Sequence, residues 1–296
     1  MKYSCIRKGP VPNDSHYLGW GYIIDKLTDK IELHENEVVL DTWADLPMKE
    51  DLEHFNLLNN NHWIGILHSV VNTDMHFNLD RFLSSKLFQS TQSNCLALIT
   101  TSEYTRKYVQ SKTHIPVHKL LFAKPEFSYQ FDLDAFLSDP QLRYSGSFGR
   151  DFYKLITLNS SIPKLISCKE NQIDKQAFSN LPQSIIFNHN FLDQESYIQL
   201  FTRTIGFSHY WDCSASNAIL EHIKTYTPLI TNRLPAIEEY LGKDYPMYLD
   251  QIIDKPDKFL KDKTFLQDVS GYLKEVSQKE ELSLEYFHNF LINFKV

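Results

Sequence analysis

The segment 212–221 combines small polar residues with a glutamate that falls two turns into a predicted helix. Ser214, Ser216 and Asn217 all favour the N-terminal cap of a helix, and the residues that follow them favour helix. The free N–H groups of a helix N-terminus attract anions, of which phosphate is the commonest. Glu221 is then placed to reach past a docked phosphate and accept hydrogen bonds from ribose hydroxyls. An ordinary βαβ unit with a solvated glutamate is the alternative interpretation.

Two basic residues follow a glycine loop earlier in the same half of the chain. Gly146 begins the run Gly-Ser-Phe-Gly-Arg after a predicted strand, and a helical segment containing Lys154 comes next. A strand, a glycine loop and a helix in this order let the backbone approach a phosphate closely. Arg150 and Lys154 lie one helical turn apart, so both can face one side and neutralise a leaving diphosphate. A loop with two solvated basic side chains is the alternative.

A histidine and an aspartate end two predicted strands of the first half. The apolar run 63–67 ends at His68, and ligands of open α/β sheets bind outside the carboxyl ends of the strands. His68 is therefore predicted to contact a sugar or an acceptor hydroxyl, as a base or as a hydrogen-bond donor. Asp41 is the second candidate for the base. A surface or structural histidine at a strand end is the alternative for His68, and solvation or capping is the alternative for Asp41.

The stretch from 212 to 232 resembles the donor-nucleotide helix of GT-B glycosyltransferases, in particular the glycosyltransferase-4-like and glycosyltransferase-1-like enzymes of bacterial-type surface polysaccharide synthesis. In that family the second glutamate of a Glu-x7-Glu motif holds the ribose of the sugar nucleotide, and Glu221 matches it. The first glutamate, which contacts the donor sugar, falls on Cys213, with Asp212 one residue earlier. Arg150 and Lys154 resemble the Gly-Arg … Lys pair of the same family, at slightly shorter spacing.

The resemblance implies an α/β protein of GT-B fold, with two Rossmann-like domains that face a cleft and C-terminal helices that cross back. Residues 1–137 would bind the acceptor, and residues 138–296 would bind the nucleotide sugar. In this family an early glycine loop of the first domain lies under the donor diphosphate and the acceptor. Gly19, Trp20 and Gly21 are therefore implied to bind the acceptor, with simple turn packing as the alternative.

The order of elements agrees with this architecture. The 296 residues leave room for two domains of about 150 each, and short apolar runs alternate with helical patterns, which predicts parallel sheets. Ser102, Asp193 and Ser283 are predicted to begin helices, and Gly242 to follow one. Strands are predicted at 37–42, 63–68, 95–101, 117–122, 142–145, 164–167, 184–188, 204–208, 228–231 and 246–249.

Composition argues against several other classes of protein. The net charge of −7 disfavours nonspecific binding of nucleic acid, which depends on neutralising phosphates. The four cysteines are far apart and predict neither a zinc site nor a disulfide framework. No signal peptide and no apolar run of about 18 residues is evident. We expect a soluble cytoplasmic protein, and peripheral contact with a membrane through a lipid-linked acceptor stays open.

The predicted reaction moves a sugar from a UDP- or GDP-linked nucleotide sugar to a hydroxyl of a glycan or glycolipid. Asp132-Leu133-Asp134 matches the DxD metal motif of another transferase class, but it lies in the predicted linker, so we interpret it as chance and expect no metal or other cofactor. A degenerate GT-B protein that binds nucleotide or glycan, or scaffolds a partner, is the alternative, because Cys213 replaces an acid. A sugar-phosphate enzyme of the same architecture, such as an epimerase, is the third reading.

Overall fold

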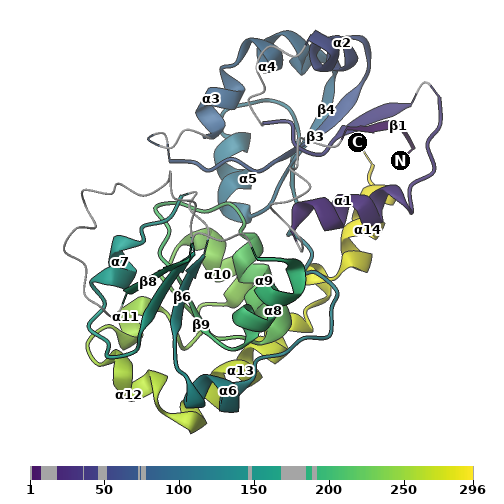
Figure 1. Cartoon of the computed structure of the whole chain (residues 1–296). Coiled ribbons are helices and arrows are strands. Elements are labelled where there is room, and N and C mark those ends of the chain that lie inside the picture. The colour runs from purple at the N-terminus through teal and green to yellow at the C-terminus, as the bar shows by residue number, and fades with distance from the viewer. Residues whose placement is uncertain are drawn as a thin grey trace.

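Two parallel sheets, each flanked by helices, form two domains that lie one above the other in Figure 1. The computed structural model describes residues 2–7, 19–35, 37–45, 52–72, 74, 78–145, 149–167, 185–188 and 192–295. Each sheet has five strands in these residues, and every strand pair is parallel. The predicted α/β fold with two Rossmann-like domains is confirmed.

The sheet of the N-terminal domain follows chain order, β1-β2-β3-β4-β5. The strands are β1 (Tyr3–Arg7), β2 (Val38–Asp41), β3 (Trp63–Leu67), β4 (Cys95–Thr100) and β5 (Val117–Lys119). The helices are α1 (Trp20–Thr28), α2 (Leu52–Asn60), α3 (Leu79–Leu83), α4 (Lys86–Thr91), the 3-10 turn η1 (Gln92–Asn94) and α5 (Glu103–Gln110). Every residue of β3 is buried, as an apolar central strand covered on both faces must be.

The sheet of the C-terminal domain has the crossed order β10-β9-β6-β7-β8. The strands are β6 (Leu142–Ser145), β7 (Lys164–Ser167), β8 (Ile185–Asn188), β9 (Ile205–Ser208) and β10 (Leu229–Thr231). The helices are α6 (Leu133–Ser138), α7 (Tyr153–Ile156), α8 (Gln194–Thr202), α9 (Asn217–Thr225), α10 (Pro235–Leu241), α11 (Leu249–Ile252), α12 (Pro256–Leu260), α13 (Lys263–Ser277), the 3-10 turn η4 (Glu280–Leu282) and α14 (Leu284–Ile292).

Most predicted elements are confirmed, and two strand predictions need correction. The strand predicted at 246–249 is wrong, because Tyr248 forms only a single bridge to Thr231 and Leu249 already begins α11. The strand predicted at 117–122 ends at Lys119. The edge strand β1 was not predicted, since only Tyr3 of its five residues is fully buried and no apolar run marks it.

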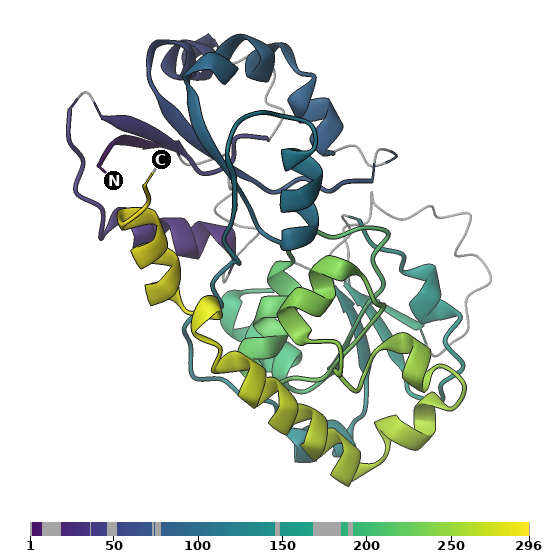
Figure 2. The same ribbon diagram turned by 180° about the vertical axis from the view of Figure 1, so that it is seen from behind.

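The last helices cross from the second domain back to the first. In Figure 2, α13 runs along the C-terminal domain and α14 continues to α1, near both ends of the chain. The hydroxyl of Tyr3 donates to the carbonyl of Leu291 at 2.8 Å, and the rings of Trp20 and Phe287 meet edge to face at 5.9 Å. The crossing that the resemblance implied is therefore present.

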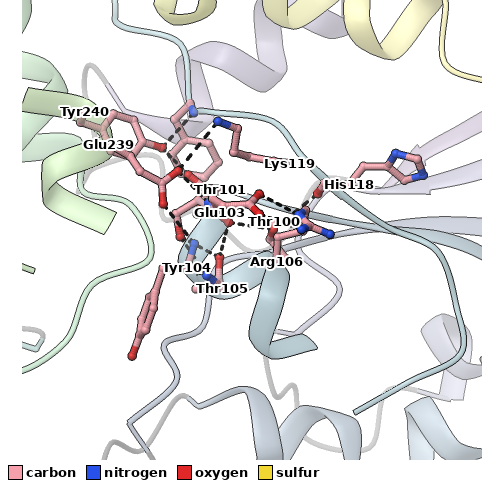
Figure 3. A network of polar contacts seen from close by, with 12 residues as sticks. Thr100, Thr101, Glu103, Tyr104, Thr105, Arg106, His118, Lys119, Glu239 and Tyr240 are labelled. Atoms are coloured by element: carbon pink, nitrogen blue, oxygen red, sulfur yellow. Dashed lines mark hydrogen bonds and ion pairs between the residues drawn. The ribbon is translucent and has the colours of Figure 1, made fainter. Parts of the chain in front are cut away.

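Polar contacts between α10 and α5 also join the domains (Figure 3). The carboxylate of Glu239 accepts the N–H groups of Glu103 and Tyr104 at 2.7 and 3.0 Å. Those N–H groups belong to the first turn of α5, so a side chain of one domain caps a helix of the other. The hydroxyl of Tyr240 donates to the carbonyl of Thr101 at 2.8 Å. One apolar core extends through both domains beneath these contacts.

Candidate functional site

Two helix N-termini meet where the domains face each other. Gly19 is the N-terminal cap of α1, and Ser216 is that of α9. They lie so close that a Cβ atom built on Gly19 would come within 2.2 Å of the Asn217 side-chain amide. The first-turn N–H groups of a helix carry partial positive charge, so two converging N-termini favour an anion.

The loop before α9 is fastened to the first domain. Ser214 donates its hydroxyl hydrogen to the carbonyl of His68 at 2.5 Å. The carboxylate of Asp212 accepts the N–H of Asn72 at 2.7 Å through one oxygen and the N–H of Cys213 at 2.8 Å through the other. Ser214 and His68, which were predicted separately, are thus in direct contact across the domain boundary.

Arg150 adds a fixed cation to the N-terminus of α9. Its Nη2 donates to the hydroxyl of Ser216 at 3.1 Å, and its guanidinium lies over the ring of Tyr210, 5.0 Å from the ring centre. The Tyr210 hydroxyl in turn lies 2.7 Å from the Ser216 hydroxyl. An arginine remains charged at any physiological pH, so this cluster holds permanent positive charge beside the helix end.

Lys154 does not share a helix face with Arg150. The helix α7 begins only at Tyr153, so Arg150 precedes it and pairs in a single bridge with Tyr210. The expected one-turn relation between the two cations is therefore wrong. Lys154 is exposed, and its charge reaches His209, whose pKa is lowered mainly by burial and partly by that charge. Gly146 lies outside the described residues.

Glu221 is buried and already paired. One oxygen of its carboxylate accepts the hydroxyl hydrogen of Tyr197 at 2.8 Å, and only 8% of the residue is exposed. Burial raises the pKa of Glu221, while the Tyr197 hydrogen bond and the charge of Arg143 oppose that rise. The alternative of a solvated glutamate is excluded. Ribose binding by Glu221 stays a prediction, and the second carboxylate oxygen, which Tyr197 does not engage, would be the acceptor.

His68 is a neutral imidazole enclosed by aromatic rings. Its ring centre lies 4.6 Å from those of Trp20 and Trp43, and its Nε2 lies 2.9 Å from the carbonyl oxygen of Thr42. A carbonyl only accepts, so Nε2 carries the proton and Nδ1 is the acceptor. Burial lowers the pKa of His68 to about 4. It can accept a hydrogen bond from a hydroxyl but is a weak base.

Asp41 is fully buried in a structural ion pair. Arg7 Nη1 and His54 Nε2 contact its two oxygens at 2.9 and 2.7 Å. Burial alone would raise the pKa of Asp41, but the His54 hydrogen bond and the Arg7 charge outweigh it and hold the pKa below its usual value. With no exposed surface and both oxygens engaged, Asp41 cannot meet an acceptor hydroxyl in this arrangement, which argues against its role as base.

A carboxylate that the sequence reasoning missed supports His68. Asp45 accepts the N–H groups of His68 and Ser69 through one oxygen, at 2.7 and 2.5 Å. Burial raises the pKa of Asp45 to about 6, although these donors lower it. Its position after a predicted strand, in the run Asp-Thr-Trp-Ala-Asp, was the available signal. Asp45 fixes the backbone where β3 ends.

The predicted acceptor residues Gly19, Trp20 and Gly21 occupy different environments. Gly19 faces Asn217, as described above, whereas Gly21 lies inside the first turn of α1. Trp20 is 2% exposed and stacks on Phe122 at 4.6 Å between ring centres. Trp20 therefore packs as a core residue that also touches His68, and acceptor binding by this loop stays a prediction.

The acidic pair around Leu133 has structural partners. Asp132 caps α6 by accepting the N–H of Ala135, and Asp134 contacts Lys263 Nζ at 2.8 Å. Within the described ranges, no group of three or more histidine, cysteine or acidic side chains could hold a metal ion. No helix among those residues is both long and apolar enough to cross a membrane.

Two facing parallel α/β domains with C-terminal helices that cross back define the GT-B fold of glycosyltransferases. No protein-family model and no curated protein sequence matches the chain. Solved structures of this fold do. TarM has a TM-score of 0.66 at 11% identity, over 92% of this chain and 57% of that one. A variant of S. aureus TarM was solved in complex with fondaparinux, α-GlcNAc-glycerol and UDP.

Two further structures show the same likeness. The pneumococcal O-GlcNAc transferase GtfA, in complex with UDP and GlcNAc, has a TM-score of 0.57 at 10% identity, over 91% of this chain and 58% of that one. The trehalose-6-phosphate synthase OtsA has a TM-score of 0.59 at 12% identity, over 90% and 73%. The chain thus spans less than three fifths of TarM and GtfA.

Proposed function

We propose that the protein transfers a sugar from a nucleoside diphosphate sugar to a hydroxyl of a glycan or glycolipid, without a metal ion. The observation that carries the proposal is the cluster of Arg150 and Ser216 at the N-terminus of α9, where α1 and the first domain approach it. Proteins of the same fold have been solved with UDP and sugars.

The chemistry follows from where charge develops. In sugar transfer the leaving diphosphate gains negative charge, and preorganised donors at that position lower the barrier. Arg150 and the first-turn N–H groups of α9 would supply those donors. Glu221 would hold the ribose, and Nδ1 of His68 would accept a hydrogen bond from a hydroxyl of the sugar or the acceptor.

A protein that binds the donor without transferring its sugar is the second candidate. Burial raises the pKa of the Cys213 thiol to about 12, so no charge replaces the acid of the family's motif. The neighbouring Asp212 does not substitute for it, because its two oxygens accept the N–H groups of Asn72 in the first domain and of Cys213. The proposal also includes a cytoplasmic location. If the acceptor is a glycolipid, the protein would in addition contact a membrane surface.

Ligand-induced thermal stabilisation tests the donor site. A ligand that binds only the folded protein raises its melting temperature, so a panel of UDP, GDP and their sugar conjugates should identify one that does. Arg150→Gln removes a charge-assisted contact worth about 1.5–3 kcal/mol, which predicts roughly tenfold to hundredfold weaker binding. Arg203→Gln, at an exposed position of the same domain, is the matched control and should bind as wild type.

Turnover then separates the two candidates. Release of free sugar or of an elongated acceptor from the bound nucleotide sugar supports transfer. Tight binding with no release over hours indicates the binding protein. Equal nucleotide affinity in Arg150→Gln and wild type would show that Arg150 does not bind the diphosphate. It would refute both the transferase and the binding protein as proposed at this site.

A further inference from the structure

A groove on the outside of the C-terminal domain lies at the opposite end of α9 from the candidate site. It is lined by residues just before and within the start of α6, by Tyr226 at the end of α9, and by one face of α13, and it encloses about 290 Å³. Figure 1 shows α6, α9 and α13 on the same side of that domain. The nine residues of α9 separate the two places by about 13 Å.

The backbone at Tyr226 carries a conformational cost. Its φ of 57° places it in the left-handed region, where it ends α9. Glycine usually occupies this position, because a side chain there costs free energy. The hydroxyl of Ser270 on α13 donates to the carbonyl of Tyr226 at 2.9 Å and holds the turn. A tyrosine is therefore kept at a position whose backbone favours glycine, with its ring partly buried against the apolar core.

A second conformational cost lies on α13, which also lines the groove. Gly271 is exposed in the middle of the 15-residue helix α13, where alanine would favour the helix. A Cβ atom built on Gly271 meets nothing within 4 Å, so no close packing demands the glycine. A large side chain at this position would fill part of the groove, which Gly271 helps to line. Tyr226 and Gly271 thus both occupy positions whose backbone favours another residue type, and both line the same groove.

The lining has the chemistry that a sugar ring needs. Tyr226 and Phe131 line it with aromatic carbon, which suits the apolar C–H faces of a pyranose. Gln130 and Gln267 are exposed, and their carboxamides make no hydrogen bond to any described residue. A carboxamide both donates and accepts, as the hydroxyl edge of a sugar does. Lys274 is the one charged residue among the described residues that line the groove.

From this lining we propose that the groove binds a sugar ring of an anionic glycan, outside the cleft between the domains. The ring would lie against Tyr226 and Phe131, the carboxamides would bind its hydroxyls, and the ammonium of Lys274 would pair with its acidic group. The binding does not depend on the donor site, because no lining residue belongs to the cluster around Arg150.

Ligand-observed NMR with two defined fragments tests the proposal. Hyaluronan tetrasaccharide is the anionic probe, and fully N-acetylated chitotetraose is the neutral comparison. Wild type should show saturation transfer to the hyaluronan fragment at millimolar concentration and bind chitotetraose more weakly. Tyr226→Gly removes the ring at a position where glycine suits the backbone, and Gly271→Phe fills the open space. Each should weaken binding by about tenfold or more.

Matched variants keep the result interpretable. Gly271→Ala should melt at a higher temperature than wild type and bind within about a factor of two, because a methyl group leaves the groove open. Lys274→Gln should abolish the preference for the anionic fragment. Hyaluronan binding that survives in both Tyr226→Gly and Gly271→Phe, or that is lost in Arg150→Gln, would place the glycan elsewhere and overturn the proposal. Absence of binding to folded wild type would overturn it too.

Discussion

The carboxylate of Glu239 is a cap that one domain supplies to a helix of the other, and its removal should be measurable. It accepts two backbone N–H groups, of Glu103 and Tyr104, and lies 3.9 Å from Lys119 Nζ. Only 20% of the side chain is exposed, so solvent screens these bonds weakly. Glu239→Ala leaves the N–H groups of Glu103 and Tyr104 without this acceptor, at the position where the domains join.

The magnitude follows from the cost of a lost cap. Replacing a capping acceptor by alanine costs about 0.5–2 kcal/mol, and the charge of Glu239 places it near the upper value. At roughly 2.1 cal/mol/K per residue, a 296-residue chain has an unfolding entropy of about 0.6 kcal/mol/K. The expected loss is therefore about 2–3 °C in melting temperature, if both domains unfold together.

Calorimetry and hydrogen exchange measure the two consequences separately. Glu239→Gln keeps one acceptor oxygen without the charge and should fall between alanine and wild type. Glu275→Ala, at an exposed position of α13, is the control and should melt as wild type. The amides of Glu103 and Tyr104 should exchange faster in Glu239→Ala. A melting temperature equal to that of wild type, with unchanged exchange at these two amides, would refute the capping argument.

Three further substitutions test the buried titratable groups. Tyr197→Phe removes the hydroxyl that Glu221 accepts and should destabilise the fold by about 1–3 kcal/mol in urea denaturation. Burial raises the pKa of Glu221 and the Tyr197 bond lowers it, so this bond stabilises the charged carboxylate more than the neutral form. The loss should therefore increase as the pH is raised through the pKa of Glu221, and a loss that does not change with pH would contradict this. Folding lowers the pKa of His68 from 6.5 to about 4. Between these two pH values the unfolded chain binds more protons than the folded protein, so the free energy of unfolding rises with pH from about 4 to 6.5. His68→Gln should flatten the rise, and an unaltered stability profile would show that His68 titrates normally. Asp41→Asn breaks a buried pair with Arg7 and should cost about 3–5 kcal/mol, with kcat per folded molecule unchanged. A large fall in kcat at full folding would restore Asp41 as the base.

Local signals in the sequence predicted most elements correctly. Runs of apolar residues marked β3 and β4, because a covered parallel strand needs no polar face. Ser102, Asp193 and Ser283 cap their helices as predicted, each accepting an N–H three residues ahead. These features depend on residues that are close to each other in the sequence. The edge strand β1 has neither an apolar run nor a cap, and it forms by pairing with β2, which the local sequence does not show.

The contacts within the candidate site depend on residues far apart in the chain, and the sequence shows little of them. Nothing near Asp41 indicates that Arg7 and His54 claim its oxygens. Likewise, the Tyr197 hydroxyl that holds Glu221 comes from another helix. The sequence could indicate which residues end a strand or begin a helix. It could not indicate which of these residues form hydrogen bonds or ion pairs with side chains from elements elsewhere in the chain.

The pairing of the first strand with the last helix also bears on how the chain is made. Tyr3 and His118, of β1 and β5, contact Leu291 and Phe294 in or just after α14. The helix α14 begins at Leu284, which follows the last residue of β5, Lys119, by 165 residues. At about 5–20 residues per second, a ribosome needs roughly 8–33 seconds to add them. During that time the N-terminal domain is synthesised but lacks the helix that completes its core, so the first domain to emerge is the last to be finished.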